Sequence, residues 1–156
     1  MQLSGSEQFS QTIDELWERL TDFTLFVHTL PRVDKIERVE SRLLECRVRA
    51  GLSFFTGTLR LKFETLDEQP PTATRMRITG KGVGASVVVE NSIQLVPIDG
   101  GTELRWHSEV MELGGLLKPV GHSLIEAAAQ KVIVEGWDNF RRELGAEKIP
   151  NIQQTP

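Results

Sequence analysis

Residues that could carry chemistry are few in this sequence and stand far apart. The three histidines are His28, His107 and His122. The spacing closest to that of a metal site is His122 with Glu126, four positions apart, a pair that is more often a solvated contact on a helix. Ser123 lacks the surroundings of a nucleophile elbow, and the chain has no tyrosine to act as a general acid. We therefore predict no catalytic residues, no metal site and no cofactor.

A glycine-rich run from Gly80 to Gly84 is similar to a phosphate-binding loop, but its context does not fit. Glycines that cradle a phosphate open a helix, whereas Ser86 to Val96 has the pattern of a strand. We therefore interpret the run as a flexible hairpin, which could gate the entrance to a cavity.

Length and composition restrict the class of protein further. The 156 residues suit a single domain. A net charge of -4 argues against general nucleic-acid binding, and the single cysteine, Cys46, excludes a disulfide framework within one chain. Neither a signal peptide nor an apolar run of about 18 residues is visible. These features predict a cytoplasmic protein with no nucleic-acid partner.

The elements that would position a site begin with a strand, Gln2 to Phe9, and two short helices. Thr12 and Glu15 are typical of a capping box, and apolar residues recur at helical spacing from Ile13 to Leu20. The second short helix starts near Asp22 and stops at Pro31. Six extended segments follow: Ile36 to Glu40, Leu43 to Gly51, Phe54 to Leu66, Thr74 to Gly80, Ala85 to Pro97 and Thr102 to Leu113.

A long helix from about Pro119 to Leu144 closes the chain, with Gly145 just past its end. Consecutive strands joined by short turns predict an antiparallel meander. The fold class is therefore α+β, in the helix-grip arrangement: a curved antiparallel sheet wrapped around a long C-terminal helix. We expect residues 1–148 to form this ligand-binding domain and residues 149–156 to form a polar, disordered tail.

Alternation along the strands separates an apolar face, which we assign to the helix, from a polar face. A sheet that curls around a single helix often leaves room for a ligand. The candidate ligand-binding residues are those on the two facing surfaces: Val48, Phe63, Met76, Ile78, Val87, Val89, Asn91, Trp106, Ser108, Ile125, Ala128, Val132 and Gly136.

Two of these inward positions, Asn91 and Ser108, are polar. We favour a structural interpretation, in which each bonds a neighbour or a buried water or is turned outward by a bulge. The alternative is that they orient the polar end of a mostly apolar ligand. The opposite face carries cation pairs on three consecutive strands, which we call the basic stripe: Arg47, Arg49, Arg60, Lys62, Arg75 and Arg77. A solvated face is the favoured interpretation, and an acidic partner or an anionic membrane surface is the alternative.

Several short motifs are similar to those of one family. They are Met1-Gln2-Leu3-Ser4-Gly5, Glu15-Leu16-Trp17, Leu30-Pro31, Gly57-Thr58, Gly80-Lys81-Gly82, Gly101-Thr102-Glu103-Leu104 and Gly121-His122-Ser123-Leu124-Ile125. By their order and spacing, from Met1 to about Leu144, the chain resembles the carbon monoxide dehydrogenase G-subunit family. That family lies within the START/Bet v 1-like, or polyketide cyclase-like, superfamily. The resemblance implies a helix-grip fold with a hydrophobic cavity and an accessory role beside a molybdenum hydroxylase of the carbon monoxide dehydrogenase type. That role would be in assembly or membrane recruitment, so the protein would lie in the cytoplasm, peripheral at the inner membrane face.

Many relatives carry a hydrophobic C-terminal extension, whereas this chain ends in the polar segment Asn151 to Pro156. The leading hypothesis is a non-catalytic binding or carrier protein for a small lipophilic ligand. An enzyme of the polyketide cyclase or hydrolase type, with Asn91 or Ser108 positioning water, is the alternative. A third hypothesis is an adaptor that binds a partner through the basic stripe.

Overall fold

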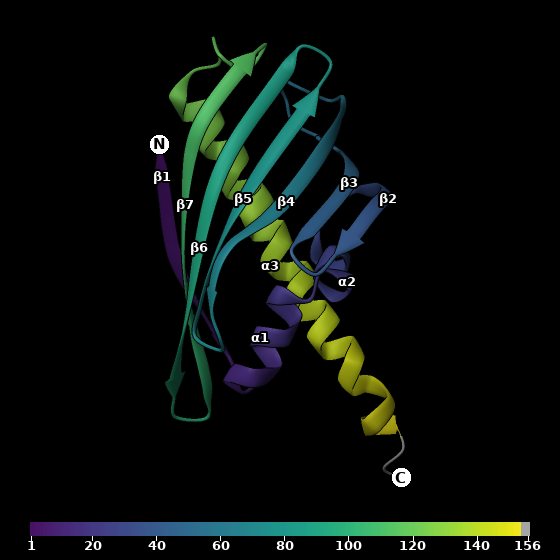
Figure 1. Cartoon of the computed structure of the whole chain (residues 1–156), viewed down its shortest axis with the longest axis vertical. Helices are drawn as coiled ribbons and strands as arrows, with labels where there is room; N and C mark the ends of the chain where they lie inside the picture. Colours follow the sequence, from purple (N-terminus) through teal and green to yellow (C-terminus); the bar gives the residue numbers. More distant parts are fainter. Residues whose placement is uncertain (154–156) are drawn as a thin grey trace.

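A curved antiparallel sheet and one long helix make up most of the computed structural model, which describes residues 1–153 and the side chains of residues 1–145 (Figure 1). The elements in chain order are β1 (Gln2–Phe9), α1 (Ile13–Thr21), α2 (Phe23–Phe26), the 3-10 turn η1 (Val27–Thr29), β2 (Val33–Glu40), β3 (Leu43–Arg49), β4 (Thr58–Gln69), β5 (Ala73–Gly82), β6 (Ala85–Ile98), β7 (Gly101–Gly115) and α3 (His122–Gln153). The seven strands run in the order β1-β7-β6-β5-β4-β3-β2. This is the predicted α+β helix-grip arrangement, with α3 crossing one face of the sheet.

The two short N-terminal helices form where side chains cap their first turns. The backbone N–H of Glu15 donates to the Thr12 hydroxyl at 3.3 Å, so Thr12 is the N-cap of α1 as the sequence indicates. Asp22 does the same for α2, accepting from the Thr24 backbone N–H at 3.0 Å. Leu16 and Leu20 then point from α1 into the core.

The strand boundaries differ from the expected ones mainly between β3 and β4. The predicted strand from Phe54 begins only at Thr58, and residues 50–57 form a loop. At the other end β4 extends to Gln69 rather than Leu66. The glycine-rich run is a hairpin, as predicted, because β5 ends at Gly82 and β6 begins at Ala85. No helix follows those glycines, so a phosphate-binding loop is ruled out by the local fold.

Both ends of α3 differ from the prediction. The helix begins at His122, because the Gly121 carbonyl accepts the first N–H groups, and Pro119 lies in the preceding turn. It also continues through Gly145, a residue that a helix tolerates in its interior at a modest cost. Of the segment expected to be a polar tail, residues 149–153 belong to α3, and residues 154–156 lie outside the described part of the chain.

Two clusters of buried side chains form the core. The first joins α1 and the middle of α3 to the sheet: Phe9, Leu16, Leu20, Leu95, Leu104, Phe140 and Leu144. The second joins α2 and η1 to the sheet: Phe23, Val27, Leu44, Cys46, Val48, Phe63 and Met76. In the first cluster, the Phe140 ring packs edge-on against the rings of Phe9, at 5.5 Å, and Trp137, at 5.7 Å. We call the three rings of Phe9, Trp137 and Phe140 the aromatic wedge. Neither cluster includes a buried residue from 122–139, the first half of α3.

An arginine ties α3 to the edge strand β1. The Arg141 guanidinium donates to the Glu7 carboxylate at 2.8 Å and to the Gln8 carbonyl at 3.1 Å. Its carbon also stands 4.2 Å above the centre of the Phe9 ring. This contact fixes the helix at the same level as the aromatic wedge.

We expect the aromatic wedge to carry much of the stability. Phe140→Ala removes a ring that is 2% exposed, and should lower the free energy of unfolding by about 3–5 kcal/mol. The control Val134→Ala removes an exposed side chain of the same helix, and should change it by less than about 0.5 kcal/mol. Chemical denaturation of the three proteins gives both values, and equal losses would contradict the wedge.

Candidate functional site

A cavity of about 300 Å³ lies between the sheet and the first half of α3. The sheet contributes its apolar face, and α3 contributes small and branched residues. Of the residues predicted to bind a ligand, seven line this cavity and no other: Val48, Ile78, Val87, Val89, Ile125, Ala128 and Val132. We call this space the outer chamber.

A second cavity of about 140 Å³ lies farther along α3, against the aromatic wedge. It is lined by Phe26, Trp137 and Phe140. Three residues predicted to bind a ligand, Met76, Trp106 and Gly136, also line it. We call it the inner chamber. Phe63 is the one candidate outside both chambers, because its ring is buried against Phe26 at 5.6 Å in the second core cluster.

The predicted polar residues Asn91 and Ser108 line both chambers, together with Leu30 and Ile133. They are register partners on β6 and β7, and the Ser108 hydroxyl donates to the Asn91 side-chain oxygen at 2.5 Å. The prediction that each bonds a neighbour is therefore confirmed. Among the described residues, the Asn91 amide nitrogen has no hydrogen-bond partner, so it remains a donor at the boundary between the chambers.

The indole nitrogen of Trp106, whose ring lines the inner chamber, is a second unsatisfied donor. The nitrogen itself is buried and has no hydrogen-bond partner among the described residues. The same ring lies directly against Gly5 of β1, where an added Cβ would stand 2.7 Å from it. A side chain at position 5 would therefore clash with the indole, and only glycine fits this close approach of backbone and ring.

Several lining residues were not anticipated from the sequence. The loop of residues 50–57 contributes Leu52 and Phe54 to the outer chamber, and the connection before β2 contributes Pro31 and Arg32. Alternation could not indicate them because they lie outside regular strands. Leu113 was missed for another reason: a bulge in β7 shifts the inward phase, pairing Val89 with Val110 but Val88 with Glu112.

Arg32 closes one side of the outer chamber. Its φ of 56° is in the left-handed region, which is uncommon for a residue with a side chain. The guanidinium donates to the Arg49 carbonyl at 3.2 Å and pairs with Glu135 of α3. One turn earlier, the Lys131 ammonium donates to the Gly51 carbonyl at 3.4 Å. The β3 end of the sheet is thus tied to α3 by polar contacts.

Cys46 lies in the second core cluster and does not line either chamber. Burial, and then the charge of Glu37, raise the pKa of its thiol to about 11. The thiol is therefore neutral at physiological pH, and a neutral thiol is a poor nucleophile.

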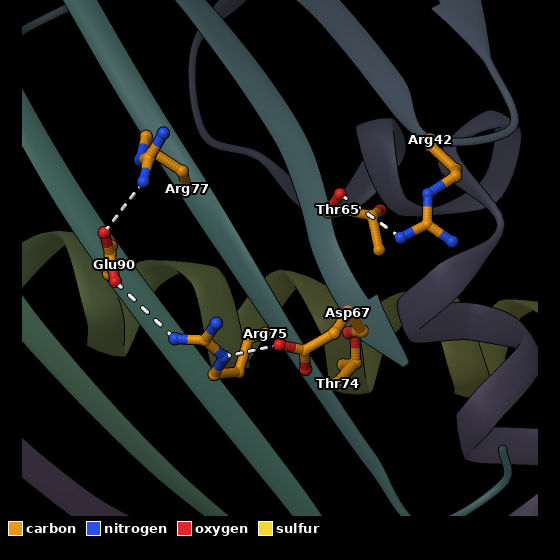
Figure 2. A network of polar contacts seen from close by, with 7 residues as sticks. All are labelled: Arg42, Thr65, Asp67, Thr74, Arg75, Arg77 and Glu90. Atoms are coloured by element: carbon orange, nitrogen blue, oxygen red, sulfur yellow. Dashed lines mark hydrogen bonds and ion pairs between the residues drawn. The ribbon is translucent and has the colours of Figure 1, made fainter. Parts of the chain in front are cut away.

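The basic stripe lies on the face of the sheet that points away from α3, and Figure 2 shows two of its cations, Arg75 and Arg77, with their acidic partners. Arg75 contacts Asp67 at 2.8 Å, and both Arg75 and Arg77 contact Glu90. The other pairs on this face are Arg47 and Arg60 with Glu37, Arg49 with Asp34, Arg38 with Glu40 and Glu45, and Lys62 with Glu64. Such exposed pairs contribute about 0–1 kcal/mol each. The pairing supports the interpretation of a solvated face.

Metal-type clusters and membrane-spanning helices are both absent from the described residues. No three His, Cys, Asp or Glu side chains among them come together as metal ligands would. No helix in the described part of the chain combines the length and the apolar character needed to cross a bilayer.

A comparison with protein families finds a match over most of the chain. A profile of the family described as the G subunit of carbon monoxide dehydrogenase, CoxG, matches residues 5–145. The chain belongs to the CoxG family. No curated protein sequence matches this CoxG family member significantly.

Solved structures share the fold of this CoxG family member at low sequence identity. A conserved protein from Geobacillus kaustophilus has a TM-score of 0.85 at 21% identity, over 95% of this chain and 97% of the other. An uncharacterised protein from Rhizobium leguminosarum has a TM-score of 0.67 at 10% identity, over 94% and 95% of the two chains. A protein from Rhodobacter sphaeroides has a TM-score of 0.62 at 18% identity, over 93% of each. These likenesses extend along nearly the whole of each chain, and they concern the fold alone.

Because α3 is bordered by open space at Gly136, we expect alanine substitutions at Gly136 and Gly5 to have opposite effects on stability. An added Cβ at Gly136 meets nothing within 4 Å, so Gly136→Ala should stabilise the fold by about 0.5–1 kcal/mol through helix propensity. Gly5→Ala, whose Cβ would overlap Trp106, should instead destabilise it by about 1–3 kcal/mol. Thermal or chemical unfolding measures both, and a destabilised Gly136→Ala would mean that the inner chamber is filled.

Proposed function

We propose that this CoxG family member is a non-catalytic binding or carrier protein for a small lipophilic molecule, held between the sheet and α3. The outer chamber supports this proposal most directly. Its lining is apolar except for Arg32, Arg49 and the pair Asn91 and Ser108. An apolar space of about 300 Å³ without a ligand leaves its walls short of packing partners, which costs stability that a bound apolar molecule would restore.

The linings of the two chambers indicate the chemical character of the ligand. The outer chamber suits an apolar body, while the boundary between the chambers offers the Asn91 amide and the Ser108 hydroxyl. A ligand with one polar group could satisfy the free donor of Asn91 there. We propose that the predicted residues of both chambers contact the ligand, and that Phe63 supports the site from the core without contacting it.

Family membership supports an accessory role for the carrier. We propose that it serves a molybdenum hydroxylase of the carbon monoxide dehydrogenase type in the cytoplasm, in assembly or recruitment at the inner membrane face. The paired basic stripe offers little free positive charge, so it gives weak support to docking through the sheet face. Binding of the lipophilic ligand is therefore the part of the proposal that stands on the geometry.

A large side chain that fills the outer chamber should block uptake of a ligand without lowering the stability of the fold. Ala128 lines the chamber, so Ala128→Trp should place an indole in empty space at little cost and block uptake of an apolar fluorescent probe. Ala127 is its exposed neighbour, and Ala127→Trp should leave uptake unchanged. Probe titration and denaturation midpoints test both variants. A destabilised Ala128→Trp, with a parent that takes up no probe, would refute the carrier proposal.

Removing the polar pair should change selectivity. The double variant Asn91→Leu with Ser108→Ala removes both polar groups together, so that neither is left unpaired. Uptake of a wholly apolar probe should be retained, while affinity for a probe carrying a hydroxyl or carbonyl group should fall about fivefold to tenfold. Competition titrations with the two probes give the ratio. A turnover reaction that disappears in this variant would instead favour the cyclase or hydrolase alternative.

A further inference from the structure

Three strongly exposed apolar side chains gather at one end of the molecule, which we call the apolar end. Val83, at the turn between β5 and β6, is 94% exposed. Leu116, in the turn after β7, is 66% exposed, and Leu124, in the first turn of α3, is 52% exposed. Figure 1 shows the β5–β6 turn, the end of β7 and the start of α3 at the same end, opposite α1.

Backbone contacts hold the segments of this end together. The Leu116 backbone N–H donates to the Gly84 carbonyl at 2.6 Å, so the hairpin turn and the turn after β7 form one unit. Turn bonds then lead toward the start of α3, because the Lys118 N–H donates to the Gly115 carbonyl at 3.1 Å and the Val120 N–H to the Leu117 carbonyl at 3.2 Å. An apolar side chain placed in water at a fixed position favours a partner that removes it from water.

At the apolar end, residues exposed to solvent are adjacent in sequence to residues that line the outer chamber. Leu116 and Leu124 face solvent, while their immediate neighbours Leu117 and Ile125 line the chamber and are each 7% exposed. A partner that covers the outer residues would therefore stand next to the cavity. A bilayer is the partner for which this matters, because a lipophilic ligand could pass between lipid and cavity without crossing water.

The charges around the apolar end also fit a bilayer. Lys81 stands two positions before Val83, and Lys118 two positions after Leu116. Both are exposed, and neither side chain has an ion pair or hydrogen bond among the described residues, unlike the paired cations of the basic stripe. Glu112 and Glu126, which lie close to Leu116 and Leu124 in the sequence, are exposed as well. The attraction of the two lysines to lipid phosphates is therefore local and modest.

We propose that the apolar end is a membrane-docking surface. Val83, Leu116 and Leu124 enter the interfacial layer of the bilayer, and the two lysines contact lipid phosphates. This inference rests on the proposed carrier function and adds where the ligand enters and leaves. It places the membrane contact at the end of the cavity rather than on the basic stripe.

Vesicle co-sedimentation of the full chain tests the surface. We expect binding to phosphatidylcholine vesicles and tighter binding when phosphatidylglycerol is included. The triple variant Val83→Ser, Leu116→Ser, Leu124→Ser should bind both at least about tenfold more weakly, because burial of apolar surface supplies most of the affinity. The control triple replaces equally apolar exposed residues elsewhere, Ile36, Ile98 and Val134, with serine, and should bind like the parent.

The charged contacts are tested separately. Lys81→Gln and Lys118→Gln should each weaken binding to the anionic vesicles about fivefold and leave binding to phosphatidylcholine nearly unchanged. Because all substituted side chains are exposed, denaturation midpoints should match the parent.

Two outcomes overturn the proposal: a parent that sediments with neither kind of vesicle, or a serine triple at the apolar end that binds like the parent. Self-association through this end, seen by light scattering and abolished in the same triple without vesicle binding, also overturns it in favour of a dimer. Uptake of the fluorescent probe from solution separates this from the carrier function. The apolar-end triple should take up probe normally, whereas a parent that takes up none would refute the carrier proposal itself.

Discussion

The distance between α3 and the sheet depends on the ring contacts of Phe9, Trp137 and Phe140. These rings pack with centroids 5.5–6.2 Å apart and separate the helix from β1 by the thickness of an aromatic side chain. Farther toward the start of α3 the inward residues are small or branched, and Ala128 and Ala129 are too short to reach the valines of the sheet. A straight helix held away from the sheet at one end by large rings must leave a gap where its side chains are small. The chambers are that gap.

Polar contacts at the edges of the sheet then keep the gap from closing or opening freely. Arg141 holds α3 to β1 beside the wedge, and Arg32 and Lys131 hold the opposite edge to α3 beside the outer chamber. Apolar contacts between helix and sheet are sparse at the level of the chambers, so these few contacts carry more of the orientation of α3 than surface pairs usually do. The left-handed φ of Arg32 is consistent with this role, because a strained backbone persists where its side chain is firmly bonded.

Much of the architecture could be predicted because it follows local rules. The N-cap at Thr12, the hairpin at Gly82 to Ala85 and the inward alternation of β6 each depend on neighbouring residues only. The inner stripe of α3 could be predicted for the same reason, and twelve of the thirteen candidate residues line one of the chambers. That any of them contacts a ligand stays a prediction. The features that could not be predicted depend on tertiary contacts. Phe63 belongs to the core rather than a cavity because Phe26 packs against it. Leu113 faces the outer chamber because a bulge in β7 changes which residues of the strand point inward.

Arg32 and residues 50–57 show a further limit of local reasoning. An arginine after a proline has the pattern of an exposed loop residue, and nothing in its neighbours indicates that its partner is Glu135, 103 positions away. Yet this pairing helps define the cavity, because the loop that it supports brings Leu52 and Phe54 over the outer chamber. The apolar lining is thus partly built from a segment without regular structure, and such segments open at lower free energy than a packed sheet. Opening this loop requires the loss of a few hydrogen bonds to Arg32 and Lys131, while the aromatic wedge keeps the rest of the fold in place.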